Sequence, residues 1–185
     1  MKEIRKKLSA LLTDAGKSAE YAYSGGDCDI TGITDDTRSV SEGCIFICVK
    51  GARFDGHSAA AEMLSKGAVM IVTDHDIKCG KQLVTDNTRL CLARLLNCFY
   101  GKPSEKLGLL AVTGTNGKTT TAHFVKHILT TLGKKCGCVG TAGNDTCSGE
   151  LKPSQHGTPT VPRATVLYSW LGEMVSNGAD YCVME

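Results

Sequence analysis

Apolar and polar positions in the first half of the chain predict a mixed α/β unit. Residues 44–49 form an apolar run bounded by Gly43 and Gly51, which is typical of a buried strand. Residues 58–67 predict a helix that ends at Gly67, and residues 68–72 predict the next strand. Asn87 is a candidate cap for a helix that runs to about residue 100. We expect its inner side to consist of Leu92, Leu95, Leu96 and Phe99.

The pattern changes after a polar linker at residues 101–106. Strands are predicted at 107–112, 136–139 and 181–184, and helices at 118–132 and 165–177. This alternation indicates a parallel sheet with helical crossovers. The inner side of the first of these helices is predicted to carry Ala122, Val125, Ile128, Leu129 and Leu132.

The fold class is therefore α/β, with one domain at residues 1–104 and a second at residues 105–185. Parallel sheets are normally covered on both faces, and three short strands with two helices do not achieve this. We therefore expect residues 105–185 to be the first part of a larger parallel-sheet domain.

Composition excludes several classes of function. The net charge is +2, without a block of like charge, and aromatic residues make up 5% of the chain, so nothing favours nucleic-acid binding. The basic, then apolar, opening residues predict an amphipathic helix rather than a signal peptide, because Asp14 interrupts the apolar stretch. No apolar run is long enough to cross a membrane. The ten cysteines form no C-x-x-C pair, which argues against a zinc knuckle and favours buried thiols in a reducing cytosol.

The sharpest motif is GTNGKTT at residues 114–120, between a predicted strand and a predicted helix. Glycines allow backbone N–H groups to surround phosphate oxygens, and the helix N-terminus adds the positive end of its dipole. Lys118 can neutralise β- and γ-phosphate charge, and the Thr119 hydroxyl can bind Mg²⁺. A usual P-loop has glycine where this chain has Val112, so the loop is a shorter variant.

Glu185 follows the strand predicted at residues 181–184. Functional side chains of open α/β sheets gather at the carboxyl ends of strands, so a carboxylate there could hold Mg²⁺ against a triphosphate. Position alone leaves a solvated terminal carboxylate equally open.

His57, His123 and His127 also invite a metal site, but no Glu follows His123 as an H-E-x-x-H site requires. We expect solvated histidines.

The glycine loop resembles the nucleotide loop of the Mur ligase family. Residues 32–57 resemble the uridine-nucleotide-binding domain that opens these ligases, since they contain Asp36-Thr37-Arg38, Gly43, Gly51 and Asp55-Gly56-His57 in order. VGTAGN, the TPT segment near residue 159 and GEMVSNGADYCVME resemble the members that add a diamino acid. The resemblance covers nearly all of this chain and about the first two fifths of such an enzyme.

The resemblance implies a role for each matching residue. Lys118 would be the catalytic residue on the phosphates, and Thr119 and Glu185 would bind Mg²⁺. Two adjacent threonines are usual near the sugar-peptide end of the substrate, but Gly157 replaces the first of them here. The ATP site would comprise Gly114, Thr115, Asn116, Gly117, Lys118, Thr119 and Thr120, and the uridine-nucleotide substrate would contact Asp35, Thr37, Ala52, Arg53, Phe54, His156, Gly157 and Thr158.

The implied activity is ATP-dependent amide-bond formation in peptidoglycan biosynthesis, through an acyl phosphate, in the cytoplasm. The substrates would be UDP-N-acetylmuramoyl-L-alanyl-D-glutamate and a diamino acid, either meso-diaminopimelate or L-lysine. No nucleic acid, membrane or obligate protein partner is implied. We expect the 185 residues alone to bind ATP weakly and not to complete the ligation.

Three alternatives remain open at this stage. The parent protein could be another ligase of the superfamily, such as the next peptidoglycan ligase or a folylpolyglutamate synthase. It could be a P-loop hydrolase or switch protein, although the shortened loop argues against this. The chain could also be a non-catalytic remnant that binds the UDP-linked precursor.

Overall fold

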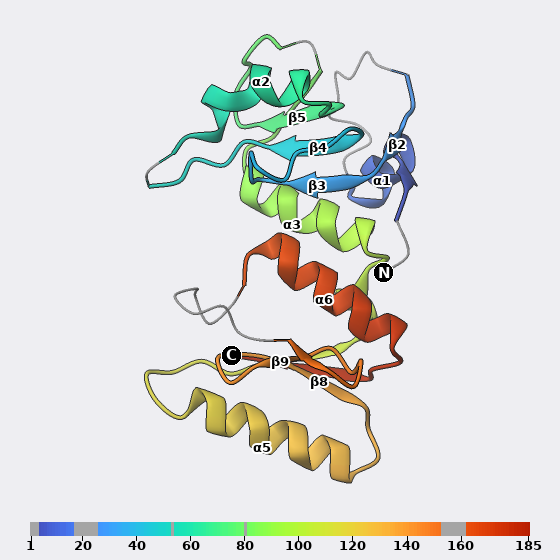
Figure 1. Cartoon of the computed structure of the whole chain (residues 1–185), viewed down its shortest axis with the longest axis vertical. Helices are drawn as coiled ribbons and strands as arrows, with labels where there is room; N and C mark the ends of the chain where they lie inside the picture. The colour runs from blue at the N-terminus through green and yellow to red at the C-terminus, as the bar shows by residue number, and fades with distance from the viewer. Residues whose placement is uncertain (1–3, 17–25, 53, 80, 153–161) are drawn as a thin grey trace. The chain divides into compact units, whose positions relative to one another are not determined.

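The computed structural model describes residues 4–16, 26–52, 54–79, 81–152 and 162–185. The chain divides into two compact units, Met1–Phe99 and Tyr100–Glu185. The first unit contains a parallel β-sheet and the second a mixed sheet with a parallel part, each flanked by helices, so the predicted α/β class is confirmed (Figure 1). Among the described residues, no helix has the length and apolar character needed to cross a membrane.

The first unit is built on a four-stranded parallel sheet in the order β3-β4-β5-β6. Helices α2 and α3 lie on opposite faces of this sheet (Figure 1). The strands are β3 (Gly32–Thr34), β4 (Cys44–Ile47), β5 (Met70–Thr73) and β6 (Gln82–Val84), and the sheet-covering helices are η1 (Gly56–Ala59), α2 (Ala60–Ser65) and α3 (Thr88–Phe99). A separate antiparallel pair, β1 (Lys6–Lys7) and β2 (Asp29–Ile30), adjoins α1 (Leu8–Asp14).

The core of the first unit follows from the apolar runs of its central strands. All four residues of β4 and of the neighbouring β5 are buried, as expected for strands covered on both faces. Phe46 and Ile71 pack with Met63 of α2 on one face. Asn87 caps α3 as predicted, because its Oδ1 atom accepts the Leu90 N–H at 2.9 Å.

The second unit contains a five-stranded sheet in the order β10-β9-β8-β11-β7. Strands β8, β11 and β7 are parallel, and β9 and β10 add an antiparallel part at the edge opposite β7. Helices α5 and α6 lie on opposite faces (Figure 1). The strands are β7 (Gly108–Ala111), β8 (Cys136–Val139), β9 (Asn144–Asp145), β10 (Leu151–Lys152) and β11 (Tyr181–Met184), and the helices are α4 (Pro103–Lys106), α5 (Lys118–Thr131) and α6 (Ala164–Ser176).

Successive residues of β11 point to opposite faces of this sheet. Cys182 packs with Leu171 and Met174 of α6, whereas Val183 packs with Ala122 of α5. This alternation follows from the two-residue period of a strand. It leaves β11 covered by a helix on each side.

Several predicted elements differ from the observed ones. The linker at 101–106 contains α4, which begins at Pro103, a residue suited to the first turn of a helix. The helix predicted at 58–67 starts as the 3-10 turn η1. The inner side predicted for residues 118–132 is wrong for Ile128 and Leu132, which are 56% and 70% exposed. With Phe124 they form a separate stripe, because only the face carrying Ala122, Val125 and Leu129 meets the sheet.

The ten cysteines are free, and seven of them are buried in the cores, as the apolar surroundings predicted. Burial raises the pKa of Cys48 and that of Cys182 to about 12, so both stay neutral thiols that act as small core residues.

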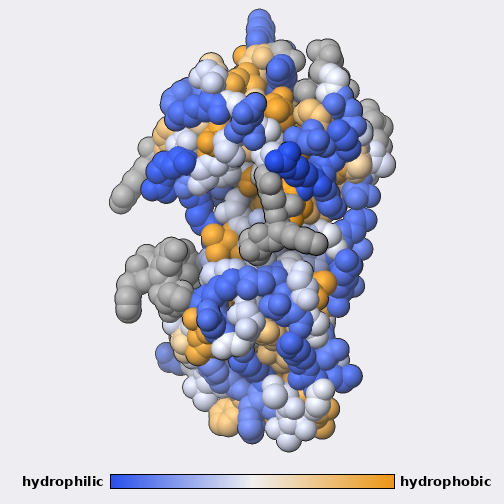
Figure 2. Space-filling model, turned by 45° about the vertical axis from the view of Figure 1, so that its right-hand side comes forward, coloured by the Kyte–Doolittle hydropathy of each residue, from blue (hydrophilic) through white to orange (hydrophobic). Residues whose placement is uncertain are grey.

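The visible surface is mostly hydrophilic, with small apolar patches between the polar side chains (Figure 2).

Two leucines of α3 offer a matched test of the first core. Leu95 is fully buried, whereas Leu90 is 47% exposed. We predict that Leu95→Ala lowers the free energy of unfolding by about 2–5 kcal/mol and that Leu90→Ala changes it by less than about 0.5 kcal/mol. Urea denaturation followed by circular dichroism measures both. Equal effects of the two substitutions would contradict the assigned inner face.

Candidate nucleotide site

The site is a loop between the end of β7 and the start of α5. Gly117 is the residue before the helix and has a φ angle of 75°, a left-handed conformation that glycine adopts without steric cost. This turn aims the first backbone N–H groups of α5 into the loop, where they lack partners within the helix. Those N–H groups and the helix dipole favour an anion at this position.

Lys118 places its ammonium group over the same loop. Its Nζ atom donates to the Gly114 carbonyl at 2.9 Å and lies 3.4 Å from the Thr115 carbonyl oxygen. Because Lys118 is the first residue of α5, its side chain can reach back across the glycine turn. A positive charge therefore accompanies the helix N-terminus.

The Glu185 carboxylate is buried and bound by two threonines. Its Oε2 atom accepts a hydrogen bond from Thr119 Oγ1 at 2.9 Å and one from Thr141 Oγ1 at 3.0 Å, and the two hydroxyl oxygens are 3.0 Å apart. The Thr141 N–H donates to Oε1 at 3.2 Å. Glu185 is 8% exposed, so this buried carboxylate has its hydrogen-bonding needs met by the two threonines.

Gly140 is what allows the carboxylate to approach β8. A Cβ atom at this position would lie 2.2 Å from Glu185 Oε1 and 2.6 Å from its Cδ atom. Any side chain here would push the carboxylate away from Thr141. The glycine before Thr141 is therefore required by the close approach of the two strand ends.

These groups line one concavity of about 340 Å³. The structure brings Lys118, Thr119 and Glu185 together, as the sequence predicted. Sequence reasoning missed Thr141, which comes directly after Gly140 at the carboxyl end of β8. Since β8 pairs in parallel with β11, the residues after the two strands lie side by side, and that rule could have found Thr141. The full lining is Thr115, Asn116, Gly117, Lys118, Thr119, Thr120, Thr141 and Glu185.

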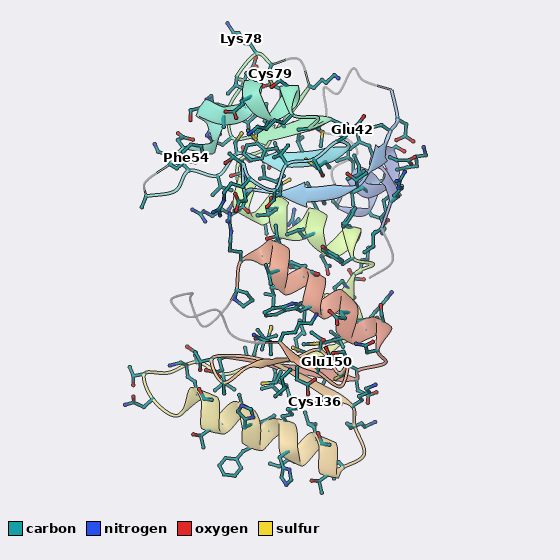
Figure 3. The ribbon with its side chains drawn as sticks, in the orientation of Figure 1. Glu42, Phe54, Lys78, Cys79, Cys136 and Glu150 are labelled. Atoms are coloured by element: carbon teal, nitrogen blue, oxygen red, sulfur yellow. The ribbon has the colours of Figure 1, made fainter. Side chains whose placement is uncertain are left out.

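The residues predicted to contact a uridine nucleotide lie in the first unit. Asp35 and Thr37 follow β3 and are partly buried. Ala52 and Phe54 are exposed on the loop after β4, where Phe54 lies away from the sheet (Figure 3). Because β3 and β4 are parallel neighbours, both loops leave the same edge of the sheet.

The loop after β3 is held by an ion pair. The Nε atom of Arg38 donates to Asp36 Oδ1 at 3.0 Å, and its Nη2 atom donates to Oδ2 at 2.7 Å. This two-point contact shapes the turn that carries Thr37. Arg53 and the predicted contacts His156, Gly157 and Thr158 lie outside the described residues.

Comparison with known proteins matches the two parts of the chain to models of one family. Residues 29–113 match the model described as "Mur ligase family, catalytic domain", and residues 112–185 match "Mur ligase middle domain". The UDP-N-acetylmuramoyl-L-alanyl-D-glutamate–2,6-diaminopimelate ligase of Geobacillus thermodenitrificans is 37% identical over 89% of this chain and 33% of its own length. A Clostridium acetobutylicum protein of the same name, numbered 2, is 35% identical over 97% of this chain and 37% of its own length.

A solved structure of such a diaminopimelate ligase superposes with a TM-score of 0.63 at 25% identity. The match covers 83% of this chain and 31% of that one. The chain thus spans about a third of the length of the curated relatives it matches. Two adjoining family models that together reach from residue 29 to residue 185, and relatives above 30% identity along most of the chain, show that it belongs to the Mur ligase family.

Proposed function

We propose that this chain is the substrate- and ATP-binding part of a ligase that joins 2,6-diaminopimelate to UDP-N-acetylmuramoyl-L-alanyl-D-glutamate. The reaction would run through an acyl phosphate in the cytoplasm, as a step of peptidoglycan biosynthesis. Residues 1–104 would bind the UDP-linked substrate, and residues 105–185 would belong to the ATP-binding domain. The names of the relatives support diaminopimelate over lysine as the amino acid.

The observation that carries this proposal is the cluster of Lys118, Thr119 and Glu185 at the N-terminus of α5. A loop of this kind suits the β- and γ-phosphates of ATP, because backbone N–H groups, a helix dipole and an ammonium group converge on it. Lys118 would offset the charge that develops when the substrate carboxylate attacks the γ-phosphate. The incoming amine would then displace phosphate from the acyl phosphate.

The oxygen cluster also fits Mg²⁺. Thr119 Oγ1, Thr141 Oγ1 and Glu185 Oε2 are 2.9–3.0 Å apart. Neighbouring ligands of an octahedral Mg²⁺ ion are about 2.9 Å apart, since each bond is about 2.0–2.1 Å long. We propose Thr119 and Glu185 as ligands and Thr141 as the residue that orients the carboxylate. The ion would neutralise charge on the phosphates.

The loops at the carboxyl edge of the first sheet are the proposed site for the uridine nucleotide. Asp35 and Thr37 offer polar contacts, and Phe54, which is 53% exposed, offers an aromatic surface. Ligands of open α/β sheets bind at this edge. The alternatives, another ligase of the superfamily or a non-catalytic remnant, predict a different product or no product in the assay below.

Lys118→Ala tests the phosphate site directly. Loss of a hydrogen bond to a charged group costs about 1.5–3 kcal/mol, which corresponds to roughly 10- to 150-fold weaker binding of MgATP. Isothermal titration calorimetry on the purified chain measures the affinity. The matched control is Lys134→Ala, an exposed lysine outside the loop, which we expect to bind MgATP as the unchanged chain does. Equal affinities for both variants would contradict the site.

The ligation reaction is tested with the native protein, purified from the organism that produces it. We predict that it converts UDP-N-acetylmuramoyl-L-alanyl-D-glutamate to a product heavier by one diaminopimelate residue, detected by mass spectrometry, and that the conversion requires ATP. Lysine in place of diaminopimelate should give much less product. Attachment of D-alanyl-D-alanine to the diaminopimelate-containing UDP-linked precursor, when both are supplied instead, would indicate the next ligase of the superfamily. Binding of the UDP-linked substrate without any product would indicate a non-catalytic remnant.

A further inference from the structure

A second cluster of polar side chains lies in the first unit, at the carboxyl end of β5. Asp74 and His75 follow this strand directly, and His57 reaches them from η1. The His57 Nε2 atom is 3.2 Å from Asp74 Oδ1, and the His75 Nδ1 atom is 2.5 Å from the same oxygen. One ligand atom from each residue lies within 4.8 Å of the others. No residue of the loop at residues 114–120 belongs to this cluster.

His57 departs from the solvated histidine expected from the sequence. Its side chain is only 10% exposed, and its Nε2 atom is buried and makes no hydrogen bond within the described part of the chain. By contrast, His123 and His127 are exposed on α5, as expected. A buried ring nitrogen that lacks a hydrogen-bond partner costs free energy, and a metal ion bound to Nε2 would remove that cost.

Asp55 sets the orientation of the His57 ring. Its Oδ1 atom lies 2.6 Å from His57 Nδ1 and also accepts the His57 backbone N–H at 3.1 Å. A carboxylate on Nδ1 keeps the proton there and leaves the lone pair on Nε2. Metal-binding histidines are typically held in this way.

The spacing of the cluster suits a tetrahedral ion. Ligands of tetrahedral zinc are about 3.3 Å apart for bonds of about 2.0–2.1 Å, close to the 3.2 Å between His57 Nε2 and Asp74 Oδ1. The shorter contact between His75 and Asp74 has room to open, because the two side chains are 62% and 44% exposed. The backbone of this turn is held by Thr73, whose hydroxyl donates to the His75 carbonyl at 2.8 Å.

The chemistry of the donors selects the class of metal. Two imidazole nitrogens and one carboxylate oxygen suit zinc and its neighbours, whereas Mg²⁺ and Ca²⁺ prefer oxygen ligands. Among the described residues, no cysteine belongs to this cluster. The donor set is therefore nitrogen and oxygen without thiolate.

We propose that His57, Asp74 and His75 bind a divalent transition metal of the zinc class, with Asp55 holding His57 in the metal-binding orientation. Three protein ligands leave at least one position for water or another small ligand. The ion would join η1 to the turn after β5 at the edge from which the loops after β3 and β4 also leave.

Cobalt(II) titration of the purified, untagged 185-residue chain tests this site. We expect one equivalent of Co²⁺ to produce visible d–d absorption without the near-ultraviolet charge-transfer band of a cobalt–thiolate bond, and Zn²⁺ to displace it. His75→Ala removes an exposed ligand, so the fold should survive while affinity falls at least tenfold. Asp55→Asn should weaken binding by about 10- to 100-fold, the usual effect of removing the partner of a metal-bound histidine.

The control variant is His127→Ala, which breaks the His123 and His127 pair on α5 and should leave Co²⁺ binding unchanged. Three results would overturn the proposal: a chain that binds neither Co²⁺ nor Zn²⁺, a thiolate spectrum, or equal affinity in the unchanged chain and in His75→Ala. Loss of binding in His127→Ala would likewise move the site to α5. Zinc-dependent shifts of the His57 and His75 ring resonances in NMR spectra identify the ligands without any substitution.

Discussion

The contact on which the second unit depends is the buried carboxylate of Glu185 between Thr119 and Thr141. It joins the end of β11, the residue after β8 and the first turn of α5. A buried carboxylate is stable only when its oxygens accept hydrogen bonds, and the two threonines supply them. Thr119 and Glu185 are also the proposed magnesium ligands, so the contact that orders the strand ends would also hold these ligands in place.

Both units use the same architectural rule. Parallel strands bring their carboxyl ends to one edge, and the loops that leave this edge carry the polar side chains. In the second unit these are the phosphate loop, Thr141 and Glu185. In the first unit they are the turns after β3 and β4 and the histidine cluster after β5. The buried strands between them supply the fixed spacing that loops alone lack.

The glycine loop at residues 114–120 could be predicted because a strand, a glycine turn and a helix adjoin in sequence. The position of Glu185 after an apolar run left a solvated carboxylate equally open, and only the family resemblance favoured a metal ligand. Thr141 depends on which strands pair, and β8 meets β11 only across 45 residues of chain. The face of α5 was misjudged at Ile128 and Leu132 because the helix has more apolar positions than the sheet covers. His57 gave no sequence signal of burial, since its partners Asp74 and His75 lie far along the chain.

The most direct test of the account is a crystal structure of the chain with Mg²⁺ and a non-hydrolysable ATP analogue. The account predicts that the β- and γ-phosphates lie in the loop of residues 114–120, with Mg²⁺ about 2.0–2.1 Å from Thr119 Oγ1 and from the Glu185 carboxylate. A nucleotide bound elsewhere, or an ion held by phosphates and water while Glu185 keeps its hydrogen bonds to both threonines, would contradict it.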